Sequence, residues 1–225
     1  MEFINTYFKN VPPLKEEFIE STIQTLYMVG VTALIAGVLG IVLGVILVAT
    51  DRGGILEHRT LYNILDKVIN LFRSIPFIIM LAVIVPFTRL IVGTSIGTTA
   101  AIVPLSIGTI PFFARQIQNA LVEVDPGVIE AAQSMGSSPL EIIFRVYLKE
   151  GLNGIIRASS LTIINLIGLT AMAGAIGAGG LGNLAISRGY NRFQDDVTLV
   201  ATIIILILVF ISQAIGNYLI RKTSH

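Results

Sequence analysis

Long apolar runs without any charged residue constrain this chain more than any other feature. They cover residues 21–50, 74–88, 90–114, 158–187 and 197–220. A bilayer core of roughly 30 Å is crossed by about 20 helical residues, so every run except 74–88 is long enough by itself. The sequence therefore predicts an all-α integral membrane protein.

The short run can still form part of a longer span. It extends backward through residues 61–72, where Asp66, Lys67 and Arg73 would lie near a membrane boundary. With that extension the sequence predicts about five transmembrane helices, near 20–49, 60–88, 93–121, 152–177 and 197–220. The alternative is four spans plus a re-entrant segment around Pro76 and Pro86.

The distribution of basic residues predicts the orientation. Five spans place the two termini on opposite sides, and more Lys and Arg residues fall on the side of the C-terminus. Cytoplasmic connections carry such an excess. We therefore expect 1–19 to be an extracytoplasmic segment, 20–221 the transmembrane domain and 222–225 a cytoplasmic tail. Acidic residues 16, 17 and 20 replace the basic start of a signal peptide, so the first run should remain in the mature protein.

Composition and missing motifs exclude several functions. The net charge of +1 gives no reason to expect nucleic acid, and the absence of cysteine excludes thiolate metal sites. No P-loop motif and no Ser/His/Asp set occurs, so we predict no catalytic residue, metal or cofactor of its own. The run Gly177–Gly182 fits G-x-G-x-x-G, but it follows an apolar span and no βαβ unit is evident. It is interpreted as close helix packing or a broken helix end.

The longest predicted cytoplasmic connection, 123–150, reads as two short helices. Asp125 and Pro126 are typical of a helix start, and Gly136 can take the left-handed conformation that ends a helix. Ser138 and Glu141 fit a capping box. The spacing predicts one apolar face on each helix: 128, 129, 132 and 135 on the first, and 140, 143, 144, 147 and 148 on the second. By spacing alone, the connection could equally be a plain linker.

Several segments of the chain resemble the permeases of ABC importers. The order Glu130-Ala131-Ala132, then Gly136 after three residues, resembles the loop by which these permeases seat on an ATPase subunit. Segments 73–97, 100–121 and 171–182 are similar to the methionine-importer branch, and the match runs from about residue 20 to the C-terminus. One departure is Leu148-Lys149, where the family often has Leu-Pro.

This resemblance implies a type I ABC importer permease fold in a bacterial cytoplasmic membrane. It implies a coupling role for six residues of the loop, which are Glu130, Ala131, Ala132, Gly136, Ser138 and Leu140. It implies as partners a second copy of the chain, two subunits that bind ATP and Mg, an extracytoplasmic solute-binding protein and membrane lipid. The implied activity is methionine import by alternating access. The alternatives are a permease for another zwitterion such as betaine, or a membrane scaffold without transport.

Polar residues within the apolar runs are candidates for a translocation pathway, because such residues are costly in a membrane. We predict that the pathway or its gate includes Thr99, Ser106, Thr109, Asn165, Thr170 and Met172. The alternative role for these residues is hydrogen bonding between helices. No ionisable residue falls securely at a membrane midplane, which argues against a proton relay and suits a solute without net charge.

Overall fold

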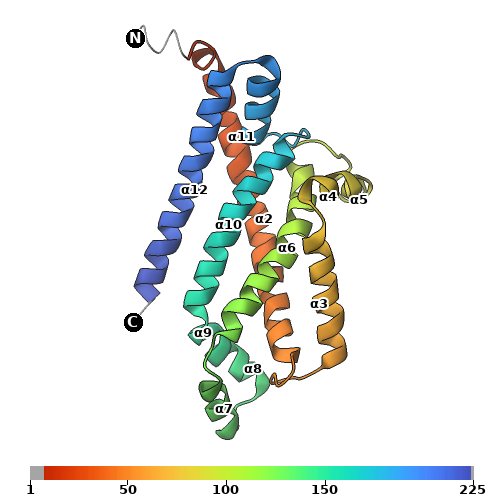
Figure 1. The fold of residues 1–225 in the computed structure, drawn as a ribbon, viewed down its shortest axis with the longest axis vertical. Helices are drawn as coiled ribbons and strands as arrows, with labels where there is room; N and C mark the ends of the chain where they lie inside the picture. The colour runs from red at the N-terminus through yellow and green to blue at the C-terminus, as the bar shows by residue number, and fades with distance from the viewer. Residues whose placement is uncertain (1–7, 224–225) are drawn as a thin grey trace. The chain divides into compact units, whose positions relative to one another are not determined.

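The computed structural model describes residues 8–223, and within that range every regular element is helical. The elements are η1 (Pro12–Leu14), α2 (Lys15–Thr50), α3 (Arg59–Ser74), α4 (Phe77–Val83), α5 (Val85–Val92), α6 (Thr98–Val122), α7 (Pro126–Ser134), α8 (Pro139–Ile142), η2 (Ile143–Tyr147), α9 (Leu148–Glu150), α10 (Leu152–Gly174), α11 (Gly180–Asn183), η3 (Leu184–Gly189), η4 (Tyr190–Arg192) and α12 (Asp195–Thr223) (Figure 1). The helical fold class is confirmed.

The chain forms two compact units that share its long helices. The first unit contains the residues up to Leu34, Pro76–Ile107 and Ile163–Ser212, and the second contains Ile35–Ile75, Gly108–Thr162 and the residues from Gln213 onward. The chain leaves one unit and enters the other after residues 34, 75, 107, 162 and 212. Four of these passages fall inside α2, α6, α10 and α12. Because the number of passages is odd, the two ends of the chain belong to different units.

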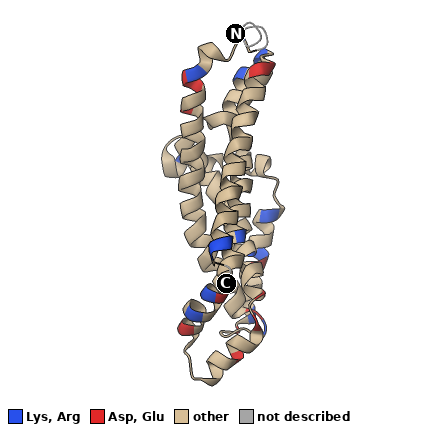
Figure 2. Cartoon of the chain, turned by 90° about the vertical axis from the view of Figure 1, so that its left-hand side faces the viewer, with Lys and Arg blue, Asp and Glu red and all other residues tan. Residues whose placement is uncertain are grey.

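Four helices within 8–223 are long and apolar enough to cross a membrane. They run over Pro12–Thr50, Thr98–Val122, Leu152–Gly174 and Asp195–Thr223. Charged residues of α2 and α12 lie at helix ends, and the stretches between them are free of charge (Figure 2). The apolar runs thus became helices because a helix satisfies its own backbone hydrogen bonds without water.

The single helix predicted over 60–88 is wrong. The segment is divided into α3, α4 and α5, with Ile75 in an extended conformation and Pro76 at the start of α4. Proline disfavours helical geometry at the residue before it and cannot donate a backbone hydrogen bond. Pro86 stands in the first turn of α5, so both prolines begin helices instead of kinking one long helix.

The other predicted helices are present with shifted ends. Helix α2 starts at Lys15, inside the predicted 1–19 segment, and α6 starts at Thr98 where 93 was predicted, because Gly93 and Gly97 both have positive φ angles. Helix α12 ends at Thr223. Residues 1–7 of the predicted N-terminal segment and 224–225 of the predicted tail lie outside the described residues.

Each unit has its own apolar core. In the first unit one buried cluster centres on Met28, Leu105 and Leu166. A second cluster joins Phe18 to Val197 and Ala201. Asn10, which precedes η1, donates from its backbone and side-chain nitrogens to the Asp196 carboxylate at the start of α12, both at 2.9 Å. In the second unit the larger cluster is built from α2, α6, α10 and the connection between α6 and α10. That packing positions the coupling-loop candidates.

Candidate functional site

The connection between α6 and α10 (residues 123–151, here called the loop) consists of α7, α8, η2 and α9 (Figure 1). Its first helix begins as predicted. The Asp125 side chain accepts a hydrogen bond from the Gly127 N–H at 2.8 Å, and Pro126 occupies the first turn. Asp125 therefore satisfies one of the backbone donors that every helix start leaves free.

Gly136 ends the first helix in the predicted left-handed conformation, with φ of 80°. The Gly136 N–H donates to the Gln133 carbonyl at 2.9 Å, and the Ser137 N–H donates to the Ala132 carbonyl at 3.1 Å. A Cβ added at Gly136 would meet nothing within 4 Å. The glycine is thus required by its backbone angle and not by crowding.

The predicted capping box of the second helix is present. The Glu141 carboxylate accepts from the Ser138 backbone N–H at 2.9 Å, and the Ser138 hydroxyl accepts from the Glu141 N–H at 3.4 Å. The hydrogen bond from the Ser138 backbone is the main cause that lowers the pKa of Glu141 below its ordinary value of 4.5. The capped turn is therefore fully formed at neutral pH.

The predicted apolar faces of the loop are only partly right. Ala132, Ile143 and Tyr147 are buried, and Ile129 and Leu148 pack against the same core. However, four residues assigned to these faces are exposed: Val128 by 41%, Met135 by 79%, Leu140 by 66% and Phe144 by 67%. Helix α7 is too short to bury a full stripe, and the π-helical turn η2 changes the spacing of the second helix. Sequence reasoning also missed the buried Ile142 and Val146.

The loop therefore presents apolar side chains to its surroundings next to acidic ones. Glu130, Ala131, Ser138 and Leu140 are exposed, whereas Ala132 is buried against the core. The loop itself carries both acidic and basic residues, among them Glu130, Glu141, Arg145 and Lys149. Capped helices held by a packed inner face and exposing apolar side chains can bind another protein.

The predicted pathway residues differ in burial and belong to both units. Ser106, Thr109 and Thr170 are buried, Asn165 is half-buried, and Thr99 and Met172 are exposed. Thr109 lies in the second unit and the others lie in the first. The Thr170 hydroxyl donates to the Ile167 carbonyl of its own helix, and the Ser106 and Thr109 hydroxyls have no partner within 8–223. Hydrogen bonds between helices, the alternative role, are thus not made by these three hydroxyls in the described structure.

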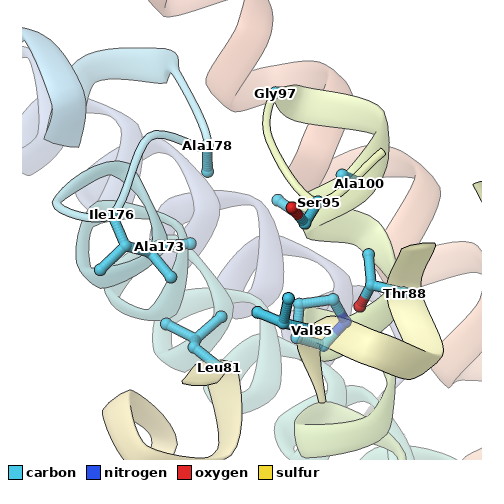
Figure 3. A pocket seen from close by; sticks show the side chains of 11 residues that line it. Leu81, Val85, Thr88, Ser95, Gly97, Ala100, Ala173, Ile176 and Ala178 are labelled. Atoms are coloured by element: carbon cyan, nitrogen blue, oxygen red, sulfur yellow. The ribbon is translucent and has the colours of Figure 1, made fainter. Parts of the chain in front are cut away.

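The first unit contains a different, small cavity that sequence reasoning missed. It is lined by residues of α4, α5, the start of α6 and the turn after α10, among them Leu81, Thr88, Gly97, Ala100 and Ala173 (Figure 3). Its volume is about 30 Å³, and the buried Thr88 hydroxyl at its wall has no partner within the described residues. The prolines that divide 59–92 were the only signal of this cavity, because its lining is otherwise small and apolar.

The glycine-rich segment 174–182 is a broken helix end, as predicted. After α10 the chain turns through Gly177, Gly179 and Gly180, all with positive φ angles, and starts α11. Side chains of α2 cap that start: Gln24 accepts from the Gly180 N–H at 2.7 Å, and Thr25 accepts from the Leu181 N–H at 2.9 Å. The turn is therefore stabilised by residues of α2 that lie 156 positions earlier in the sequence.

Comparison with known proteins identifies the class to which this arrangement belongs. Residues 36–225 match the family described as binding-protein-dependent transport system inner membrane component, and the chain belongs to that family. Within it, the probable D-methionine transport system permease protein MetI of Vibrio cholerae is 48% identical over 205 residues, covering 91% of each chain. The methionine import system permease protein MetP of Bacillus subtilis is 46% identical, covering 94% of each.

A solved structure has the same fold. The MetNI methionine ABC transporter in inward-facing conformations contains a chain that matches with a TM-score of 0.93 and 41% identity, covering 95% of this chain and 99% of that one. The type I importer permease fold predicted from the sequence is confirmed. The chain is a permease of the methionine-importer branch.

Proposed function

We propose that this chain is the membrane-spanning permease subunit of an ATP-driven importer that moves methionine across the cytoplasmic membrane. The observation that carries the proposal is the similarity to methionine permeases over more than nine-tenths of the chain. The chain has no P-loop motif, so the ATP and Mg would be bound by a separate ATPase subunit. The permease would contribute the path and no chemistry of its own.

The loop is the proposed contact with the ATPase. Its inner face is packed into the core of the second unit, so a force on the loop would reach α6 and α10 without being absorbed locally. The exposed Leu140 and Phe144 would be covered by the ATPase, and Glu130 would lie at the edge of that contact. Gly136 and Ser138 would keep the two short helices in the geometry that fits the partner.

The path itself is proposed to form between two copies of the chain. The small cavity beside Thr88 holds about 30 Å³, far less than the roughly 300–1,000 Å³ of ordinary ligand pockets, so it cannot hold the solute. The small residues of α2 and α10, among them Gly37 and Gly168, have open space around them and would allow close approach of another helix. An extracytoplasmic binding protein would deliver methionine, and two ATPase subunits would drive the change between outward and inward openings.

The proposed orientation places the N-terminus outside and the C-terminus in the cytoplasm. It takes α3 to α5 as completing one further crossing beside the four long apolar helices, so that the two ends lie on opposite sides. The excess of basic residues on the C-terminal side supports the direction. The residues before α2 would then be extracytoplasmic, those of α2 to α12 would form the permease domain, and the last residues would form a short cytoplasmic tail.

The decisive experiment is methionine uptake. Deletion of the chain should abolish high-affinity uptake, and unlabelled methionine should compete better than betaine or histidine. In proteoliposomes, two copies of the chain with two ATPase subunits should hydrolyse ATP faster when methionine-loaded binding protein is added outside. Loss of betaine uptake alone would instead identify a permease for that zwitterion. An assembled complex without solute-stimulated hydrolysis or uptake would identify a scaffold.

A further inference from the structure

A polar network fastens α3 to α6 inside the second unit. Arg115 of α6 donates from Nη2 to the Asp66 carboxylate of α3 at 2.5 Å and to Asn70 Oδ1 at 3.2 Å. Its Nη1 donates to Gln118 at 2.5 Å, and the Gln118 amide donates to the Tyr62 hydroxyl at 3.4 Å. One guanidinium thus bonds directly to two residues of α3 about one turn apart and reaches a third, Tyr62, through Gln118.

This network matters because α3 buries little apolar surface of its own. Ile69 is the one fully buried residue of α3, and it packs in a cluster with Leu47 and Ala114. The Arg115 and Asp66 side chains retain only 15% and 28% of their exposure. At that burial an ion pair is screened much less than one on the surface, and removing one partner leaves a poorly solvated charge.

The position of Arg115 gives the network a mechanical consequence. Helix α6 continues from Arg115 to Val122 and then into the Asp125 cap of the loop. Helix α3 continues through Ile75 and Pro76 into the divided segment α4–α5. A displacement of the cytoplasmic end of α6 would be passed to α3 through the shared guanidinium, together with the small apolar cluster of Ile69 and Ala114.

We propose that Asp66 and Arg115 are a positioning pair for transport, which makes α3 move together with α6 when the loop is displaced. The inference rests on the proposed function, because it assumes that ATP hydrolysis moves the loop. Neither residue is proposed to touch the solute. Their role is to keep the passage between α3 and α4 coupled to the part of the molecule on which the ATPase would act.

The test separates the pair's coupling role from simple folding by measuring methionine taken up per ATP hydrolysed. Asp66→Asn and Arg115→Gln should each lower that ratio by roughly tenfold, the usual size of a coupling between sites, while hydrolysis continues. Hydrogen exchange of the α3 amides should become faster in both variants. Lys67→Gln is the matched control, because this exposed neighbour forms no ion pair or hydrogen bond within 8–223.

An exchanged pair, Asp66→Arg with Arg115→Asp, keeps the inference testable if a single variant fails to assemble. The Asn70 and Gln118 amides each carry a donor end and an acceptor end, so both can turn to serve reversed charges. The exchanged pair should restore the uptake ratio to within about threefold of the original. An assembled exchanged complex that stays uncoupled, or single variants with a normal ratio, would overturn the inference. A wild-type complex without any methionine-dependent hydrolysis would refute the proposed function instead, and α3 exchange in Asp66→Asn would still decide whether the pair holds the helix.

Discussion

Two glycine-containing turns, one in each unit, use the same residue for different physical reasons. In the first unit the turn from α10 to α11 is crowded: a Cβ at Gly182 would lie 2.3 Å from the Ala171 carbonyl oxygen, and one at Gly174 would lie 2.4 Å from the Asn183 nitrogen. In the second unit the turn at Gly136 has open space, and only its positive φ requires glycine. The first turn needs glycine for close packing as well as for positive φ angles, whereas the second needs it only for its backbone conformation.

The two turns are also capped from different distances. The Ser138–Glu141 box satisfies the start of α8 from residues within the turn itself. The start of α11 depends on Gln24 and Thr25, which belong to the first helix of the chain. A locally capped turn keeps its shape when its surroundings move, whereas a remotely capped turn keeps it only while α2 stays in place. This difference would suit the proposed role of the loop as the contact with the ATPase.

The largest effect should come from crowding the first turn. Gly182→Ala places a methyl group against the backbone of Ala171, so it should lower the free energy of unfolding by about 3 kcal/mol or more. The yield of folded protein in detergent and its apparent Tm would measure the loss. Gly30→Ala on α2 is the control, because a Cβ there meets nothing within 4 Å and should be neutral or slightly stabilising. Equal behaviour of the two variants would contradict the packing explanation.

The next effect should come from removing a remote cap. Thr25→Val keeps the shape of the side chain but leaves the buried Leu181 N–H without its acceptor, at a cost of about 2 kcal/mol. Hydrogen exchange of the Leu181 amide should accelerate, with exchange in the loop unchanged. Thr202→Val is the matched control, because the exposed Thr202 hydroxyl donates only to the Thr198 carbonyl of its own helix. Unchanged exchange at Leu181 would show that Thr25 is not needed as a cap.

A smaller effect is expected at Gly136. Gly136→Ala forces a residue with a Cβ into the left-handed region and should cost about 1–2 kcal/mol. Gly136→Asn should recover most of that cost, because asparagine tolerates this conformation. If the loop is the coupling element, uptake by the assembled complex should be highest for the original protein, lower for Gly136→Asn and lowest for Gly136→Ala. Equal uptake by the alanine and asparagine variants would show that the conformation of this turn does not affect coupling.

The smallest effect should be that of the local cap. Ser138→Ala should destabilise the start of α8 by about 1 kcal/mol, and Glu141→Gln should weaken the same turn. Since the pKa of Glu141 is lowered in the folded protein, its contribution is complete above pH 4.5 and disappears as pH falls through the lowered value. Loop amide exchange measured from pH 7 down to pH 4 should show the box loosening only at the acid end. Loosening already near pH 6 would refute the assignment to Glu141.

These differences explain what could be predicted from the sequence. The Ser138–Glu141 box and the Gly136 turn are encoded by neighbouring residues, so spacing alone identified them. The caps at Gln24 and Thr25 could not be predicted, because nothing near 180 in the sequence indicates a partner 156 residues away. Likewise, hydropathy joined 60–88 into one helix because it measures apolar content and not the geometry that Pro76 imposes.

The pathway residues show a further limit. Sequence reasoning chose polar residues of the third and fourth spans, but the cavity of the first unit is lined mainly by small apolar residues from four separate segments. Its one unpartnered hydroxyl, Thr88, lies on α5, which hydropathy treated as the end of a longer span. The resemblance to a known branch identified the class without locating this cavity, because a family pattern names segments and not the space between them.

The hydrogen bonds between Asn10 and Asp196 can form only late in the synthesis of the chain. The partners are separated by 186 residues, so at roughly 5–20 residues per second the N-terminal segment waits about 10–40 s for the ribosome to make its counterpart. During that interval Phe18 has no Val197 or Ala201 to cover it. Helix α2 can pack earlier against α6 and α10 through residues such as Met28, but the apolar cluster around Phe18 is completed only after α12 has been made.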